Sequence, residues 1–210
     1  MQAIWDGPAV APDVLADTHF VSGAVLLDRV PGTDEVRRAN GLALWDADAE
    51  RLGEAWKWHL VPGAESSFGW ERYAWARAWS GALMPYVPDF QPERRVRLIE
   101  LPGPDGAVWR FGGSVCFDNG FDDVYLAHAR AGADFHLVVS NEAWYQESVE
   151  FDQMIAMSRM WAVESGRALA RAANSGISGL WLPDGSEAAR LVVDGRDRAV
   201  QGTLVVEVPV

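Results

Sequence analysis

The sequence lacks the features of several protein classes. Cys116 is the only cysteine among its 210 residues, which excludes an internal disulfide framework. The chain has 18 basic against 30 acidic residues and no basic run longer than two, so we expect no nucleic-acid partner. No stretch approaches the roughly 18 apolar residues that a membrane-spanning helix needs, and the amino terminus does not read as a signal peptide. As written, the sequence predicts a soluble cytoplasmic chain with no membrane domain.

The composition that remains is that of an ordinary folded domain. Apolar residues make up 49% and charged residues 23%, which is far from the composition of disordered chains. The net charge of −12 is interpreted as a contribution to solubility. We therefore expect residues 1–210 to form a single domain, and the oligomeric state, a homo-oligomer included, stays open.

Short apolar runs between turn signals indicate a protein rich in strands. The strands are predicted at 19–27, 41–46, 52–60, 96–101, 107–117, 135–140, 167–173, 177–182 and 204–208. One helix is expected from Asn119, as its N-cap, to about Arg130, and a second from about Ser148 to Ser165. Helices between hairpins and a buried strand predict a layered α+β sandwich rather than a purely parallel sheet.

The segment 66–95 differs from the rest because it combines many aromatic residues with prolines 85, 88 and 92. The plain interpretation is a helix over about 70–82 that is buried by its aromatic side chains. The alternative is an inserted, mobile apolar lid over a site.

Two residues are candidates for chemistry on their local context. Cys116 ends an apolar strand just before an expected helix, whose amino terminus would favour the thiolate. An ordinary buried cysteine remains the alternative. Lys57 lies between Trp56 and Trp58, where it is either an exposed strand lysine or a charge for a developing oxyanion.

Four motifs carry a resemblance to a known family. KWHLVPGAES at 57–66 and SVCFD at 114–118 resemble the lysine and cysteine motifs of the nitrilase, or carbon–nitrogen hydrolase, superfamily. SNEAWYQES at 140–148 and the run 159–185 are similar to one branch, the apolipoprotein N-acyltransferases. The similarity runs in order from about residue 19 to 208. It implies a four-layer α-β-β-α sandwich, from which we expect the first strand and helix to be missing.

The resemblance also implies a Glu–Lys–Cys site with no cofactor and no metal. By matched position, Cys116 is the nucleophile, Lys57 the oxyanion lysine and Glu65 a second, supporting glutamate. Trp144 matches a substrate-binding aromatic residue of the site. Phe117 and Asp118 are also expected to bind substrate. They stand where the family has a Tyr–Glu pair, and so lack a phenol and one methylene group.

This sequence differs most from the family at the position of the catalytic base. It follows a strand that ends in W-P-E, whereas this chain reads W-D-G-P at 5–8 and has Gly7 in the glutamate's place. Asp6 is the candidate base, one methylene shorter and one residue early. A shift of one residue on a strand points a side chain to the opposite face.

In the N-acyltransferase branch, an acyl group passes from a phospholipid through a cysteine thioester to the α-amine of a lipoprotein. The expected partners are therefore phospholipid, a lipoprotein amino terminus and separately encoded membrane helices. As part of a longer membrane enzyme, the domain would face the periplasm at the inner membrane. A soluble amidase with the same thiolate, and a degenerate non-catalytic relative, are the two alternatives.

Overall fold

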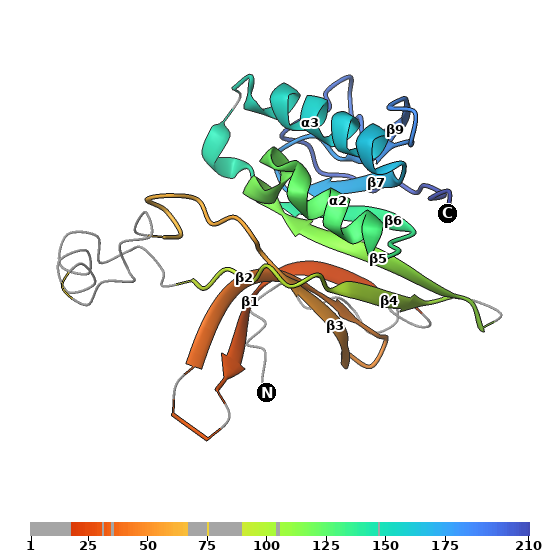
Figure 1. The fold of residues 1–210 in the computed structure, drawn as a ribbon. Helices are drawn as coiled ribbons and strands as arrows, with labels where there is room; N and C mark the ends of the chain where they lie inside the picture. The colour runs from red at the N-terminus through yellow and green to blue at the C-terminus, as the bar shows by residue number, and fades with distance from the viewer. Residues whose placement is uncertain are drawn as a thin grey trace.

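The computed structural model describes residues 18–30, 32–34, 36–66, 75, 90–103, 106–146 and 148–210, whose strands form two sheets (Figure 1). The smaller sheet is antiparallel and contains β1 (Phe20–Arg29), β2 (Val36–Trp45) and β3 (Arg51–Trp56). The larger sheet runs in the order β4 (Leu98–Pro102), β5 (Val108–Val115), β6 (Phe135–Ser140), β7 (Ala168–Ala173), β8 (Gly179–Trp181) and β9 (Glu187–Arg190).

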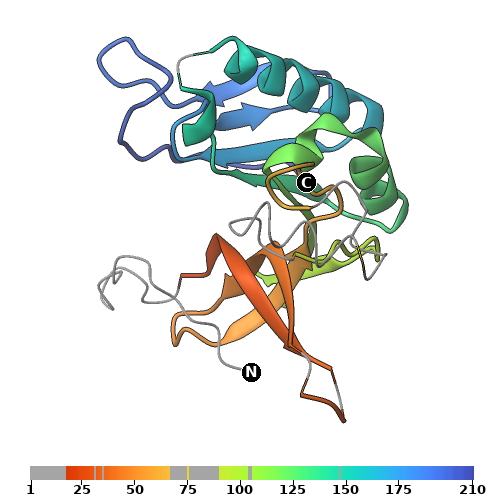
Figure 2. The ribbon, with the colours of Figure 1, turned by 90° about the vertical axis from the view of Figure 1, so that its left-hand side faces the viewer.

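The centre of the larger sheet is parallel. β5, β6 and β7 run in one direction, and antiparallel neighbours flank them on both sides. Parallel strands need crossover connections, which α2 (Asp122–Arg130) and α3 (Glu150–Ser165) provide. Both helices lie on one face of the larger sheet, and the smaller sheet lies on the other (Figures 1 and 2). The carboxyl ends of β5 and β6 therefore meet at one edge.

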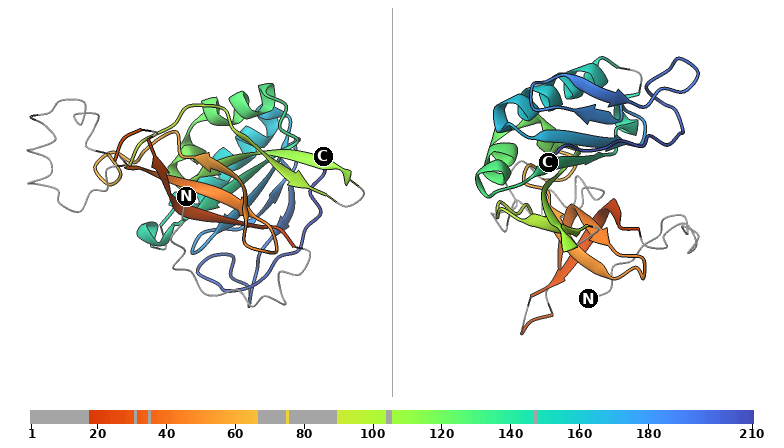
Figure 3. Two further views of the ribbon diagram at one scale, coloured as in Figure 1. Left: turned by 90° about the horizontal axis from the view of Figure 1, so that it is seen from below. Right: turned by 90° about the vertical axis from the view of Figure 1, so that its right-hand side faces the viewer.

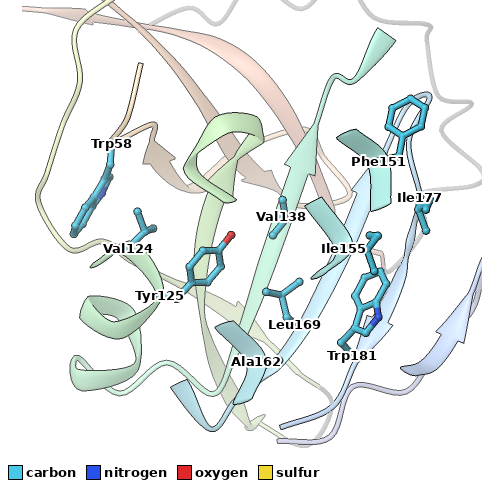
Figure 4. Packing of buried hydrophobic residues seen from close by; sticks show 10 residues of the cluster. All are labelled: Trp58, Val124, Tyr125, Val138, Phe151, Ile155, Ala162, Leu169, Ile177 and Trp181. Atoms are coloured by element: carbon cyan, nitrogen blue, oxygen red, sulfur yellow. The ribbon is translucent and has the colours of Figure 1, made fainter. Parts of the chain in front are cut away.

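Two apolar clusters hold these layers together. Between the helices and the larger sheet lie Trp58, Val124, Tyr125, Val138, Phe151, Ile155, Ala162, Leu169, Ile177 and Trp181 (Figure 4). Between the two sheets lie Leu42, Leu44, Ala55, Ile99, Phe111, Val115, Phe135, Ala168 and Leu180 (the sheets are seen from two further sides in Figure 3). Full burial of a large apolar side chain contributes about 1.5–3 kcal/mol, so these interfaces dominate stability. The described residues thus form three layers of the expected α+β sandwich.

The helix expected from Asn119 begins later. Residues Cys116–Gly120 form a short 3₁₀ helix, η4, and Phe121 is the N-cap of α2. The prediction of Asn119 as N-cap was therefore wrong. The side-chain amide nitrogen of Asn119 donates to the Met154 carbonyl at 2.8 Å, and its side-chain oxygen Oδ1 accepts from the Tyr125 hydroxyl at 2.9 Å. These tertiary hydrogen bonds replace the local cap.

The predicted strand at 204–208 was also wrong, because these residues join no β-ladder. Val206 and Val208 pack against the cluster between the sheets while Val205 is exposed, so the alternation in the sequence reflects packing alone. The unpredicted strand β9 pairs with β8 instead.

Several sequence-based expectations fall outside the described residues. They include Asp6, most of the segment 66–95 and its two interpretations as helix or lid. Within the described ranges, no helix has the length and hydropathy needed to cross a bilayer.

Candidate active site

Cys116 lies in a turn at the carboxyl end of β5. Its φ of 50° is in the left-handed region, which costs a residue with a side chain about 1–3 kcal/mol and is typical of functional positions. The thiol is partly exposed, and its sulfur lies 3.9 Å from the carbonyl oxygen of Asn141, which directly follows β6. The thiol thus lies at the edge where β5 and β6 end, packed against the cluster between the two sheets.

Lys57 follows β3 and is buried, with an exposed fraction of 1%. Its Nζ donates to Glu65 Oε2 at 2.6 Å, and its backbone N–H donates to the Asn40 carbonyl at 2.8 Å. The interpretation as an exposed strand lysine was therefore wrong. A buried ammonium without a partner costs several kcal/mol, so the contact with the Glu65 carboxylate stabilises Lys57 at this position. Lys57 is also the only lysine in the chain, a sequence signal that points to a specific role.

Glu65 organises the loop that carries Lys57. Besides the ammonium, its Oε2 accepts the Val61 backbone N–H at 2.8 Å, and its Oε1 accepts the Asn40 amide at 2.7 Å. Both carboxylate oxygens are therefore engaged. This arrangement suits a residue that orients the lysine, as its predicted supporting role requires.

Asp118 joins the lysine loop to the cysteine turn. Its buried carboxylate accepts the backbone N–H groups of Trp58 at 3.1 Å, His59 at 2.8 Å and Val115 at 3.1 Å. Burial raises the pKa of Asp118 to about 6, although the N–H donors of His59 and Val115 and the nearby Lys57 charge oppose the rise. The carboxylate points into the protein, so the structure gives it a positioning task.

The two predicted aromatic residues of the site, Trp144 and Phe117, lie at the same edge of the sheet, and Phe117 is half-buried. Trp144 lies in the short 3₁₀ helix η5 (Ala143–Tyr145) after β6 and is 83% exposed. Phe117 packs edge-to-face on Phe121 with ring centroids 5.2 Å apart. Both side chains remain candidates for substrate contact.

Three residues of the site were not singled out in the sequence. Tyr145 is the last residue of η5, and burial, together with the electrostatic effect of Cys116, raises the pKa of its phenol to about 12. Glu142, which follows β6, and Arg171, which lies in β7, form a buried ion pair. Tyr145 and Glu142 stand inside the 140–148 motif and Arg171 inside the 159–185 motif, so closer attention to the motifs could have found all three.

The buried pair is tied to the loop that faces Cys116. Glu142 Oε1 accepts the Ser140 hydroxyl at 3.0 Å, and the Glu142 N–H donates to the Asn174 side chain at 2.9 Å. Burial lowers the pKa of Arg171 to about 10, which leaves the guanidinium charged at neutral pH. In the part of the chain that the structure describes, no cluster of His, Cys, Asp and Glu side chains could hold a metal ion.

Residues 17–208 match the carbon–nitrogen hydrolase family. The chain belongs to this family. Among curated members, it is 33% identical over 165 residues to apolipoprotein N-acyltransferase of Ralstonia nicotianae, covering 76% of this chain and 29% of that protein. It is 31% identical over 185 residues to the enzyme of that name from Gloeobacter violaceus, covering 87% of this chain and 33% of that protein. The chain therefore spans about a third or less of these relatives.

Solved structures agree on the fold. An amidase of the nitrilase superfamily from Nesterenkonia AN1 superposes with a TM-score of 0.57 at 20% identity, covering 85% of this chain and 58% of that one. A Saccharomyces cerevisiae member of branch 10 of the superfamily gives a TM-score of 0.55 at 16% identity, covering 86% and 58%. The chain has the nitrilase-like α+β sandwich fold, as the resemblance implied.

Proposed function

We propose that this chain is a thiol acyltransferase domain of the apolipoprotein N-acyltransferase type, with Cys116 as nucleophile. The observation that carries the proposal is the linkage at one sheet edge. A cysteine in a strained, partly exposed turn is joined through Asp118 to the loop that holds the buried Lys57–Glu65 pair. A thiol that is linked in this way to the loop of a paired cation and carboxylate suits acyl transfer.

In the proposed first half-reaction, the Cys116 thiol loses its proton to a base, for which Asp6 is the candidate. The thiolate attacks the ester carbonyl carbon of a phospholipid, and the resulting oxyanion faces the Lys57 ammonium. The tetrahedral intermediate collapses, the ester C–O bond breaks, and the lysophospholipid oxygen takes the proton back. Cys116 is left as a thioester.

In the second half-reaction, the α-amine of a lipoprotein attacks the thioester carbonyl. The C–S bond breaks and an amide forms, while the amine proton passes to the base and from there to the sulfur, which regenerates the Cys116 thiol. Exposed apolar side chains at the same edge suit a lipid donor, since Trp144 is 83% and Val149 70% exposed. The proposal places this reaction at the periplasmic face of the inner membrane, together with membrane helices from a longer or separate chain.

A second candidate is a hydrolase that acts on a C–N bond, as the name of the matched family favours. The same thiolate would attack an amide carbonyl, expel ammonia or an amine, and pass the acyl group to water. The third possibility is a non-catalytic relative, and the experiment must distinguish it from the acyltransferase and the hydrolase.

The single cysteine makes the test direct. The chain is incubated with phospholipid vesicles and its intact mass is followed, with Cys116→Ala as the control. We expect an acyl mass increase on Cys116 that hydroxylamine removes. Amine released from a panel of small amides, without that adduct, would favour the hydrolase. If neither reaction occurs in a folded chain, both enzyme assignments are wrong.

A further inference from the structure

We propose that Asn174 is a positioning residue, whose side chain holds the loop after β6 against Cys116 by two hydrogen bonds. The loop comprises residues 141–145. This inference rests on the proposed role of Cys116 as the nucleophile. It concerns what keeps the backbone beside the sulfur in place.

The parallel register of β6 and β7 brings Asn174 to this loop. Ser140 lies opposite Ala173, so Asn141 and Asn174 are the first residues beyond the two strands. The Asn174 backbone N–H donates to the Ser140 carbonyl at 3.2 Å. The Asn174 side chain therefore starts from a backbone that is itself hydrogen-bonded to the end of β6.

The side chain of Asn174 uses both ends of its amide. Its Nδ2 donates to Asn141 Oδ1 at 2.8 Å, and its Oδ1 accepts the Glu142 backbone N–H at 2.9 Å. Asn141 Oδ1 also accepts the Ala143 N–H at 3.3 Å. Position 174 thus needs a donor and an acceptor on one short side chain, which asparagine has and alanine lacks.

The restrained loop faces the proposed nucleophile. The carbonyl oxygen of Asn141 accepts from the Cys116 thiol, with the sulfur 3.9 Å away. Trp144, the exposed candidate for substrate contact, lies three residues later in η5. A misplacement of about 1 Å near reacting atoms can slow a reaction by about 100-fold, so the hold on Asn141 is relevant to the reaction.

The turn after β7 fits the loop in a second way. A Cβ atom at position 176 would overlap the Glu142 carboxylate, so only glycine is accommodated there. The same carboxylate is paired with Arg171 of β7. The ion pair holds the side chain of Glu142, whereas Asn174 holds its backbone.

Asn174→Ala deletes both hydrogen bonds and tests the inference. The Glu142 N–H should exchange with solvent about tenfold faster in ¹⁵N NMR, because two hydrogen bonds that restrain the loop are lost. N-ethylmaleimide should alkylate Cys116 about threefold faster, since the weak contact between thiol and carbonyl is released. Formation of the hydroxylamine-sensitive adduct from phospholipid vesicles should instead become about tenfold slower.

Two substitutions at Asn141 provide a rescue test. Asn141→Asp retains an oxygen that accepts from Asn174 Nδ2 and from the Ala143 N–H, so it should keep the wild-type rates. Asn141→Leu has a similar size and no acceptor, so its alkylation and acylation rates should change in the same directions as in Asn174→Ala. This pair also decides the question if Asn174→Ala does not fold.

Asp184→Ala is the matched control. It also deletes two side-chain hydrogen bonds of an exposed turn, those from the Ser186 N–H at 2.8 Å and the Ser186 hydroxyl at 2.6 Å. Because β8 runs antiparallel to β7, this turn lies at the opposite edge of the sheet. The control should leave all three rates at Glu142 and Cys116 unchanged.

Wild-type exchange and alkylation rates in a folded Asn174→Ala chain would overturn the inference. Identical behaviour of the two Asn141 variants, or the same changes in Asp184→Ala, would also contradict it. The exchange and alkylation measurements need no acyl donor. If phospholipid leaves no adduct on the wild-type chain, the proposed function fails and these two measurements still decide the role of Asn174.

Discussion

Two buried polar regions of the molecule stabilise their polar side chains in different ways. At the site edge, the charges of Lys57, Glu65, Glu142 and Arg171 are buried in pairs. Between α2 and β6, His128 and His136 are buried with ring centroids 6.2 Å apart, and neither forms an ion pair with another residue that the structure describes. Burial lowers the pKa of His128 to about 4 and of His136 to about 3, so both are neutral.

The difference between buried charged pairs and buried neutral histidines indicates which of the two regions serves chemistry. A buried charge costs several kcal/mol unless it is paired, so its retention at an exposed edge indicates a task beyond stability. Neutral imidazoles packed among Trp58 and Tyr125 behave as part of the core. We therefore expect changes at the edge to affect thiol chemistry and changes at the histidines to affect folding.

The largest effect on stability is expected when the Glu142–Arg171 ion pair is broken. Arg171→Met leaves the Glu142 carboxylate buried without its cation and should lower the free energy of unfolding by about 3–5 kcal/mol, measured by urea denaturation. Replacing both residues, in Arg171→Met with Glu142→Leu, should restore much of the stability but not the rate of Cys116 alkylation. If the double variant regains both, the pair serves folding alone.

A smaller effect is expected from acid at the histidines. Their pKa is lowered in the folded state, so the unfolded chain binds more protons below pH 6.5. Stability should then fall as the pH drops from about 6.5 towards 4, by about 3 kcal/mol for His136. Urea midpoints of the wild type and His136→Gln across this range should converge as the pH is lowered.

One carboxylate opposes this trend. The pKa of Asp118 is raised to about 6 in the folded state, so its protonation favours folding as the pH falls from about 6 to 4. Wild-type curves therefore understate the histidine effect, and the comparison with His136→Gln removes the Asp118 contribution. Equal slopes in the two chains would contradict the assignment of neutral histidines.

The smallest change removes a partner of Glu65. Asn40→Ala deletes the amide that donates to Glu65 Oε1 and should cost about 1 kcal/mol in unfolding free energy. If Glu65 orients Lys57, the variant should also slow formation of the Cys116 acyl adduct. Asn40→Asp places two carboxylates together and should slow it further, whereas equal rates in all three chains would show that this contact has no role in the reaction.

Much of the fold follows from local patterns. The apolar runs of β5 and β6 and the helical spacing of α3 each lie within one short segment, so the chain's own propensities predict them. Cys116 could be placed at the end of a strand for the same reason. The motifs around Lys57 and Cys116 then indicated the family, which the matched residues 17–208 confirm.

Tertiary structure decided which side chains meet. The parallel register pairs Val138 with Arg171 and Ser140 with Ala173, and this brings the guanidinium to the Glu142 that follows β6. The same assembly turned Asn119 inward to Met154 and left 204–208 without a strand partner. Local sequence determines most of the strands, the place of Cys116 at the end of β5 and the residue types at the edge. The contacts of Tyr145, Glu142 and Asp118 depend on layer packing and strand register, which no short segment encodes alone.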